Sequence, residues 1–261
     1  MIDVQTVKCP DCGHSFDFYS YVGEEPLDSN VRLTKKLVQR TSWEELGAEI
    51  CSGRATLCLD VGDKLEFELK NGKKVSVEVA AVNPYGDNVA FSFTNVLQNG
   101  AMNSTDTNRG GFCESKMADI LEKEILPLLP DDLVEVITPR KITQKLSIVD
   151  SSGRRIERLF ERECKLWLPS YTEVFGHHER YSGCDIGDIR FPLFATRRGR
   201  TKYTLDDDLS YWWLRSPNVG YSTYFWYVNS YGYGSYSGAS SVNGVCPCFI
   251  IGRKPESKVD E

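Results

Sequence analysis

The chain has 261 residues, of which 41% are hydrophobic, so it is long enough to bury the core of one large domain. Its formal net charge is −6 and no basic stripe runs along it, which disfavours a nucleic-acid partner. No apolar run approaches the length of a membrane span, and the N-terminus lacks the basic start and apolar run of a secretory signal. We therefore expect a cytoplasmic protein whose nine cysteines are mostly reduced thiols.

A Cys-x-x-Cys-Gly knuckle stands near the N-terminus, at Cys9, Cys12 and Gly13. Two thiolates on a tight turn fill two corners of a tetrahedral zinc site. The next cysteines, Cys51 and Cys58, are spaced too widely to supply the second pair of a zinc ribbon. Cys9 and Cys12 are thus candidate ligands of a structural zinc, with a degenerate knuckle or a site completed by another chain as alternatives. No other cofactor is expected.

Two helices and a hairpin are predicted in the first half of the chain. Ser42 followed by Glu45 is a capping box that begins a helix over 43–51, and a second helix is expected over 115–126, where Pro127 ends it. Apolar residues alternate with charged ones over 64–79, and Asn71-Gly72 between the two halves predicts a hairpin with a type I′ turn. A third strand is expected over 89–94.

The middle of the chain predicts short strands over 133–138, 145–149 and 166–168, with a turn at 151–153 after the second. Ser170 is expected to cap a short helix that carries Glu173. His177 and His178, with Glu173 and Glu179, could seed a metal site, but adjacent histidines on a loop point in different directions. We interpret this pair as solvated surface.

The stretch 211–251 has an unusual composition. It contains no charged residue after Arg215, and six of the chain's thirteen tyrosines fall within sixteen residues, separated by Gly, Ser and Asn. Tyrosine gives a large amphipathic contact area at low entropy cost, and Ser, Gly and Asn give adaptable hydrogen bonds, so this composition is typical of a binding loop. Low-complexity disorder is the alternative. Buried strands are expected at 212–214 and 249–251, one at each end of a loop region over 218–241.

Several motifs resemble those of a known domain family. They are Trp-Trp-Leu-Arg-Ser-Pro-Asn at 212–218, Asn-Gly-Val-x-Pro-x-Phe at 243–249, Leu-Trp-Leu-Pro-Ser at 166–170 and Asn-Gly-Ala-Met-Asn at 99–103. Together they resemble a domain of unknown function that is common in gut bacteria and their phages, over about residues 31–253. The C-terminal end is similar to the variable regions of diversity-generating retroelements, whose variable proteins have a C-type-lectin-like fold.

The resemblance implies which side chains contact a ligand. Retroelements of this kind rewrite adenines, typically in asparagine codons, which can become Tyr, Ser, Gly or Thr codons but never Trp codons. Trp226 is therefore assigned to the fixed scaffold. The implied ligand-binding residues are Tyr221, Thr223, Tyr224, Tyr227, Asn229, Tyr231, Tyr233, Ser235, Tyr236 and Ser237.

The resulting expectation is an α+β chain with a C-type-lectin-like, formylglycine-generating-enzyme-like domain over 31–253. Its variable region spans 211–251, an N-terminal knuckle segment occupies 1–30, and 254–261 is a polar tail. The expected function is non-enzymatic binding of an unknown protein or surface ligand.

Two other functions stay open. One is a phage tail-associated adhesin that recognises a host surface, which would place the protein in virions. The other is an oxidoreductase of the formylglycine-generating type, working through Cys246 and Cys248, although these two cysteines are closer together than the pair of that family.

Overall fold

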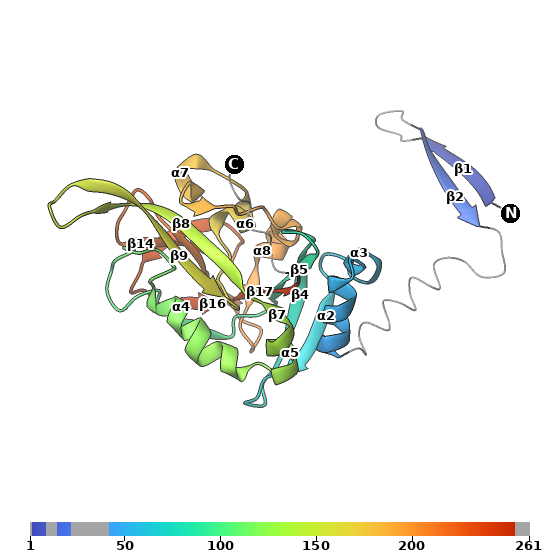
Figure 1. Cartoon of the computed structure of the whole chain (residues 1–261), viewed down its shortest axis with the longest axis horizontal. Helices are drawn as coiled ribbons and strands as arrows, with labels where there is room; N and C mark the ends of the chain where they lie inside the picture. Colours follow the sequence, from blue (N-terminus) through green and yellow to red (C-terminus); the bar gives the residue numbers. More distant parts are fainter. Residues whose placement is uncertain (1, 9–14, 22–41, 254–261) are drawn as a thin grey trace. The chain divides into compact units, whose positions relative to one another are not determined.

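The structure is a computed structural model that describes residues 2–8, 15–21 and 42–253 (Figure 1). Two predictions fall outside these residues, namely the zinc ligands Cys9 and Cys12 and the polar tail 254–261. The chain divides into two compact units, Met1–Thr41 and Ser42–Glu261. In the first unit, strands β1 (Ile2–Lys8) and β2 (Ser15–Tyr21) pair as an antiparallel hairpin.

The second unit contains an antiparallel five-stranded sheet in the order β3-β4-β5-β17-β7. Helix α2 (Trp43–Cys51) packs on it, and the ring of Trp43 meets those of Phe67, Phe91 and Phe249 edge-on at 5.6–6.5 Å. The capping box of Ser42 and Glu45 is present, which confirms the predicted start of this helix. The strands are β3 (Lys64–Glu68), β4 (Lys74–Val82), β5 (Asn88–Phe93), β17 (Cys248–Gly252) and β7 (Ile137–Thr138).

The β3–β4 hairpin is confirmed, but its predicted turn is wrong. A type I′ turn needs positive φ at both central residues, whereas here only Gly72 has positive φ, at +81°. The amide of Gly72 donates to the carbonyl of Leu69 at 2.8 Å, and Leu69 also pairs with Lys73. The connection is therefore a three-residue loop, a type I turn followed by a left-handed glycine.

A second five-stranded sheet has the order β15-β14-β13-β16-β6. Strands β13 and β16 run parallel, with Trp212 opposite Gly244, and all other neighbours are antiparallel. All six residues of β13 are buried, so the predicted buried strand at 212–214 is confirmed and extends further. The strands are β6 (Gln98–Gly100), β13 (Trp212–Pro217), β14 (Tyr224–Val228), β15 (Gly234–Gly238) and β16 (Asn243–Val245).

The C-terminal strands join the two sheets. Strand β16 belongs to the second sheet and β17 to the first, and only Cys246 and Pro247 lie between them. Cys248 also forms an isolated bridge with Trp167, so the predicted strand at 166–168 is a buried segment with a single bridge. Trp167 and Phe249 are both fully buried. The junction lies in the core and fixes one sheet against the other.

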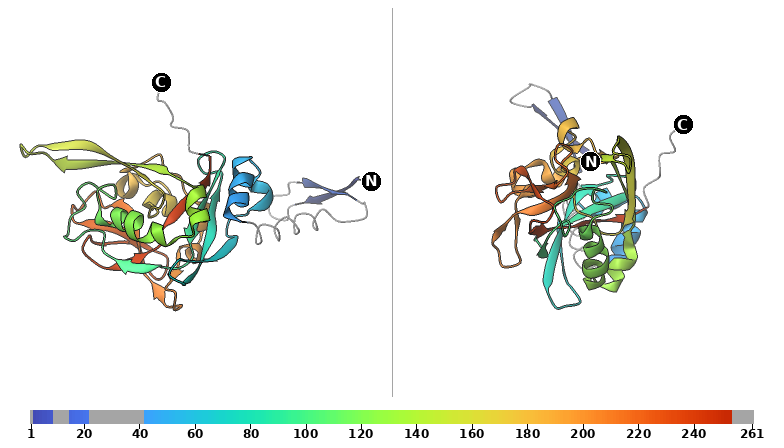
Figure 2. Two further views of the ribbon diagram at one scale, coloured as in Figure 1. Left: turned by 60° about the horizontal axis from the view of Figure 1, so that its bottom comes forward. Right: turned by 90° about the vertical axis from the view of Figure 1, so that its left-hand side faces the viewer.

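A long hairpin projects from this unit (Figure 2). Strands β8 (Arg140–Val149) and β9 (Arg155–Cys164) pair along their whole length, whereas β10 (Asp185–Ile186) pairs with β8 only at residues 143–144. The predicted strand 145–149 is thus the outer half of a longer one. Strand β9 was not predicted because most of its side chains are exposed and charged, which leaves no alternation of apolar and polar residues.

Helical segments cover the remaining surfaces, and one prediction there is wrong. Of the strand predicted over 133–138, Ile137 and Thr138 do form one, as β7, whereas residues 133–136 form the end of helix α5 (Asp131–Val136), whose first turn after Pro130 carries two acidic residues that favour a helix start. Helix α4 (Lys116–Ile120) begins at Ser115 as predicted but continues past Pro127 through π and 3-10 turns. These are η1 (Leu121–Ile125) and η2 (Leu126–Leu128), and the other short elements are α3 (Ala55–Cys58), α6 (Tyr171–Phe175), α7 (Glu179–Ser182), η3 (Pro192–Ala195), α8 (Arg197–Arg200), β11 (Lys202–Tyr203) and β12 (Leu209–Ser210).

In the described part of the chain the architecture is α+β, with one antiparallel and one mixed five-stranded sheet, smaller sheets of two or three strands, and short helices. Among the described residues, no helix is both long and apolar enough to cross a membrane.

Candidate functional site

The tyrosine-rich stretch forms a β-hairpin and not a loop. Strands β14 and β15 make five successive cross-strand pairs, from Tyr224 opposite Gly238 to Val228 opposite Gly234. All residues of β14 are aromatic or β-branched, which favours a strand. Strand β15 lies at the edge of the second sheet. The prediction of a loop over 218–241 is correct only outside these two strands.

The turn of this hairpin is made by Asn229 to Gly232. The side-chain oxygen of Asn229 accepts from the amides of Tyr231 and Tyr233, at 3.0 Å each. Gly232 has φ +76°, and a Cβ there would lie 2.8 Å from the carbonyl oxygen of Arg197. The side chain of Asn229, one of the predicted ligand-binding residues, is therefore engaged in holding the turn.

Aromatic rings form a continuous surface on one side of the hairpin. Tyr221, Tyr224 and Tyr236 lie within 5.5–5.7 Å of one another, and Tyr236 contacts Trp226 edge-on at 5.5 Å. Trp226 then meets Tyr171 of α6 at 4.8 Å and Tyr181 of α7 at 4.9 Å. We call this surface the aromatic face; its members are Tyr171, Tyr181, Tyr221, Tyr224, Trp226 and Tyr236.

The outer members of the aromatic face are open to solvent. Tyr221 is 54% exposed and Tyr236 is 44% exposed, and at the turn Tyr231 and Tyr233 are 71% and 51% exposed. Trp226, in contrast, is 6% exposed, in keeping with its assignment to the scaffold. The buried Trp226 thus has the half-buried Tyr171 and Tyr181 and the exposed Tyr236 around it, and exposed tyrosine rings offer large contact areas at little cost in side-chain entropy.

The predicted ligand-binding residues do not all lie on this face. Because side chains alternate along a strand, Tyr227, Ser235 and Ser237 point to the opposite side of the hairpin. There the ring of Tyr227 contacts Tyr211 at 5.8 Å, and the hydroxyl of Ser237 donates to Ser241 at 2.9 Å. The ten predicted residues are therefore divided between two faces and a turn, and Thr223 lies half-buried just before β14.

One buried asparagine fixes the chain that leads into the hairpin. The amide nitrogen of Asn108 lies within 2.8–3.1 Å of the carbonyl oxygens of Asn218, Tyr221 and Tyr224. The backbone amide of Asn108 also donates to the carbonyl of Ser222 at 2.8 Å. All four contacts are to backbone oxygens, so they hold this segment whatever side chains it carries. Asn108 was not among the residues that the sequence indicated for the site.

Replacing Asn108 with Asp should destabilise the protein more than replacing it with Ala. The alanine variant leaves buried carbonyls unsatisfied and should cost about 1–3 kcal/mol of unfolding free energy. The aspartate variant adds a negative charge that faces the same carbonyl oxygens. Urea unfolding monitored by tryptophan fluorescence measures both values, and an aspartate variant as stable as the alanine variant would contradict this role of the amide.

A buried cluster of ion pairs includes Arg215 of β13, the strand that pairs with β14. Arg215 of β13 donates to Glu173 of α6 at 2.6 Å and pairs with Asp188, while Arg140 of β8 pairs with both carboxylates. Burial raises the pKa of Glu173, but the guanidinium groups of Arg215 and Arg140 outweigh this effect and lower it to about 2. The cluster ties three separate elements together, so it determines where α6 and its Tyr171 meet the hairpin.

Asp185 adjoins this cluster and titrates differently. Its carboxylate accepts from Gln144 at 2.8 Å and from Ser216, and burial raises the pKa of Asp185 to about 6, against the opposing influence of Arg215. Because the folded pKa is higher than the unfolded one, the stability that Asp185 contributes is complete below about pH 4 and is lost as the pH rises through 6.

An Asp185→Asn variant should remove this dependence on pH. The difference in unfolding free energy between wild type and variant should shift in favour of the wild type by about 1–3 kcal/mol as the pH falls from 7 to 4. Denaturant titrations at several pH values give this difference. A constant difference across the range would show that Asp185 does not carry the effect.

The other residues considered from the sequence do not form a site. His177, His178 and Glu179 are exposed, which confirms the interpretation as surface, and Glu173 is occupied by its two arginines. Over the described ranges, no group of three His, Cys, Asp or Glu residues is arranged to hold a metal. Cys246 and Cys248 are fully buried, and burial raises the pKa of both thiols.

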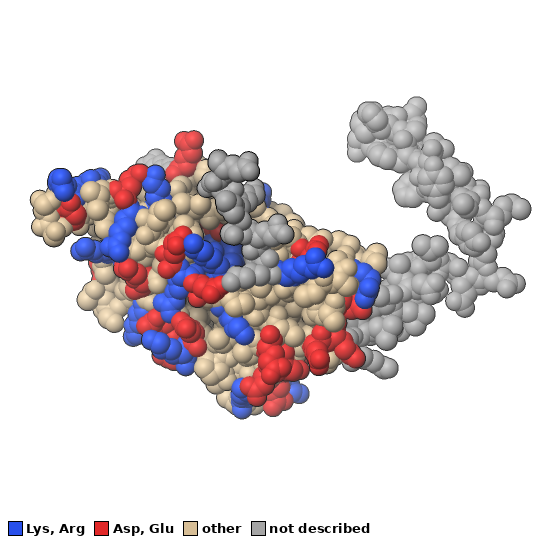
Figure 3. All heavy atoms as spheres, in the orientation of Figure 1, with Lys and Arg blue, Asp and Glu red and all other residues tan. Residues whose placement is uncertain are grey.

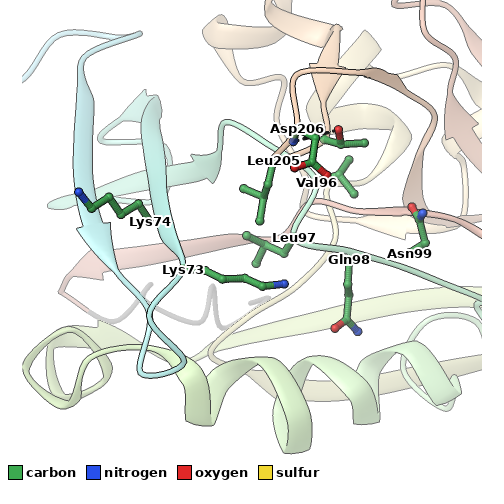
Figure 4. Close-up of a pocket in the computed structure, with 9 residues that line it drawn as sticks. Lys73, Lys74, Val96, Leu97, Gln98, Asn99, Leu205 and Asp206 are labelled. Carbon is green, nitrogen blue, oxygen red and sulfur yellow. Dashed lines mark hydrogen bonds between the residues drawn. The ribbon is translucent and has the colours of Figure 1, made fainter.

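A shallow hollow of about 440 Å³ lies between the β3–β4 hairpin and the segment that follows β11 (Figure 4). Lys73 and Lys74 line it from the hairpin, and Thr204 to Asp206 line it from the opposite side. A neighbouring hollow of about 570 Å³ shares Lys74 and Leu205. Both hollows have linings of mixed charge and polarity, and no catalytic set of side chains converges in them.

The fold and the site define an α+β protein that presents an exposed aromatic hairpin face on a scaffold fixed by buried ion pairs. Residues 86–253 match the family described as Domain of unknown function (DUF6273). The chain belongs to this family, whose matched range includes the aromatic face, Asn108 and the ion-pair cluster. Comparisons with curated proteins and with solved structures gave no match.

Proposed function

We propose that this protein is a non-enzymatic binding protein in which a C-type-lectin-like scaffold presents the aromatic face to a protein or surface ligand. The observation that carries the proposal is that backbone bonds hold the shape of the hairpin, whereas tyrosine side chains form its exposed surface. Backbone pairs and Asn108 hold its shape, while the side chains of Tyr221 and Tyr236 are about half exposed and, within residues 42–253, make only ring contacts with their neighbours. Residues that contribute surface and little structure are suited to recognition.

The same separation of backbone bonds from exposed side chains supports the proposal that the side chains of the aromatic face are diversified. The bonds from Asn108 reach carbonyl oxygens, and the β14–β15 ladder also uses backbone atoms, so exchange of the tyrosines leaves both intact. The structure of the hairpin also refines the set of contact residues. Tyr221, Tyr224 and Tyr236 on the face, together with Tyr231 and Tyr233 at the turn, are the proposed contacts, and Asn229 supports the turn.

Deep sequencing of the 3′ end of the gene across a population of its source cells tests this proposal, together with a search of the flanking DNA for a near-copy of the segment that encodes 211–251. We expect substitutions at Tyr221, Tyr224 and Tyr236, with Trp213 and Trp226 unchanged. A uniform sequence without a template copy would contradict diversification and leave a face of fixed specificity. Substitutions spread evenly over scaffold and face would contradict the assigned roles.

A further inference from the structure

Four arginines gather beside the turn of the tyrosine hairpin. Arg190 precedes η3, and the others belong to helix α8. Within residues 42–253, none of the four forms an ion pair with a carboxylate. On the face that Figure 3 displays, basic and acidic side chains are interspersed. The members of this arginine cluster are Arg190, Arg197, Arg198 and Arg200.

Three of these charges, those of Arg190, Arg197 and Arg200, act on one another. Arg190, Arg197 and Arg198 are exposed, whereas Arg200 is half-buried. Burial lowers the pKa of Arg200, and the positive charges of Arg190 and Arg197 lower it further. Like charges held this close repel, and a bound anion would relieve the repulsion. In a chain of net charge −6, the cluster is a local positive region.

The arginine cluster is attached directly to the hairpin turn. Arg197 donates from Nη1 to the hydroxyl of Tyr233 at 2.6 Å, and its guanidinium lies 5.3 Å from the centre of that ring. Arg200 donates from Nε to the carbonyl of Gly232 at 2.9 Å and from Nη1 to the carbonyl of Phe194 at 2.7 Å. These contacts hold α8 against the turn, so a ligand on the turn tyrosines would also meet the arginines.

The cluster also borders the aromatic face. The guanidinium of Arg200 lies 5.1 Å from the ring centre of Phe175, and that ring meets Tyr171 at 4.8 Å. A path of rings thus leads from the arginines through Phe175 and Tyr171 to Trp226. Cationic and aromatic groups are placed along one surface.

We propose that the arginine cluster is an anion-binding subsite of the aromatic face and that it takes an Asp/Glu-rich segment of a protein partner. The inference rests on the proposed binding function and names the chemistry of the ligand. Guanidinium groups bind carboxylates through paired N–H donors, and Arg198 has no side-chain partner in the part of the chain that the structure describes. Faces rich in Tyr, Ser and Gly are typical of protein recognition, so a protein segment is favoured over other polyanions.

Binding of a fluorescein-labelled peptide of alternating Glu and Tyr tests the subsite, with an otherwise identical Gln/Tyr peptide as its neutral match. Fluorescence anisotropy with the full chain should show the Glu peptide binding at least about tenfold more tightly at low salt, with the preference shrinking at high salt. An Arg190→Gln/Arg198→Gln variant should lose most of the preference, since neither residue supports the turn. An Arg197→Gln variant should also lose part of it.

The matched control is Arg155→Gln on the exposed β8–β9 hairpin, which should keep the preference. Equal binding of the two peptides, or an Arg155 effect as large as that of the double variant, would overturn the proposal. Tighter binding of an oligonucleotide of equal charge would overturn it in favour of a nucleic-acid partner.

A Tyr221→Ser/Tyr236→Ser variant distinguishes failure of the arginine subsite from failure of the proposed binding by the aromatic face. If this variant still binds the Glu peptide, binding by the aromatic face is contradicted and the arginine subsite is supported. If binding is lost in this variant but does not depend on salt or on the arginines, the arginine subsite is contradicted and binding by the aromatic face is supported.

Discussion

Replacing Glu173 with alanine should lower the free energy of unfolding by about 3–5 kcal/mol. The substitution leaves two buried guanidinium groups, those of Arg140 and Arg215, with Asp188 as their only remaining carboxylate in the cluster. It also removes one of the two bonds of the α6 capping box, because a carboxylate oxygen of Glu173 accepts from the amide of Ser170 at 2.8 Å, while the bond from the amide of residue 173 to the hydroxyl of Ser170 is kept. An uncompensated buried charge and the weakened capping box both destabilise the fold.

Urea unfolding of the wild type and of a Glu179→Ala variant provides the comparison. Glu179 lies on the surface at the start of α7, so its replacement should change stability by less than about 0.5 kcal/mol. The low pKa of Glu173 adds a second readout: its contribution is complete above about pH 4.5 and is lost as the pH falls towards 2. A Glu173→Ala effect below about 1 kcal/mol would show that the cluster does not hold the scaffold together.

Replacing Tyr221 and Tyr236 together with serine should weaken ligand binding about 30-fold or more while changing the unfolding free energy by less than about 1.5 kcal/mol. Both rings are roughly half exposed, and they stack on each other at 5.7 Å. Their removal therefore takes away contact surface and only a modest amount of packing. Peptides recovered by panning a random phage-displayed library on the wild-type protein serve as ligands, and fluorescence anisotropy gives their affinities.

Two control variants locate the binding surface. Tyr203→Ser removes a ring that is 43% exposed on β11, away from the hairpin strands, and should leave affinity unchanged. Tyr227→Ser removes a ring from the opposite side of the hairpin and should also leave affinity unchanged. If the Tyr227 variant loses binding and the double variant keeps it, the ligand binds the opposite side. If panning yields no peptide that binds, the proposed function is contradicted.

Local signals in the sequence predicted local structure well. The predicted capping box at Ser42 and the predicted cap at Ser170 both form, and at each site the hydroxyl and the carboxylate three residues later satisfy free amides at the helix start. The alternation over 64–79 likewise predicts the β3–β4 hairpin. The predicted type I′ turn is wrong because Asn71 has negative φ and the loop contains three residues instead of two. The strand predicted over 133–138 is wrong for residues 133–136, because the apolar residues of this segment indicated a strand more strongly than Pro130 and the acidic residues after it indicated a helix start.

The candidate site was predicted only in part, for reasons of distance and periodicity. The composition of 211–251 indicated a tyrosine-rich binding surface, but its Gly and Ser residues favoured a loop, so the alternation that sends Tyr227 and Tyr236 to opposite sides was missed. Tyr171 and Asn108 join the site through contacts between residues far apart in the chain, for which a single sequence carries no signal. The pairing of Arg215 with Glu173 is hidden for the same reason.

The claim that the exposed tyrosines form a binding face and do not support the fold is tested most directly by a protease-resistance screen. The screen uses a displayed library in which each of seven positions is varied singly. Five lie on the proposed contact surface, at Tyr221, Tyr224, Tyr231, Tyr233 and Tyr236, and two belong to the scaffold, at Trp213 and Trp226. We predict that most substitutions at the five tyrosines keep the chain protease-resistant and that most at the two tryptophans do not. If the tyrosines are as intolerant as the tryptophans, their side chains belong to the fold and not to a binding face.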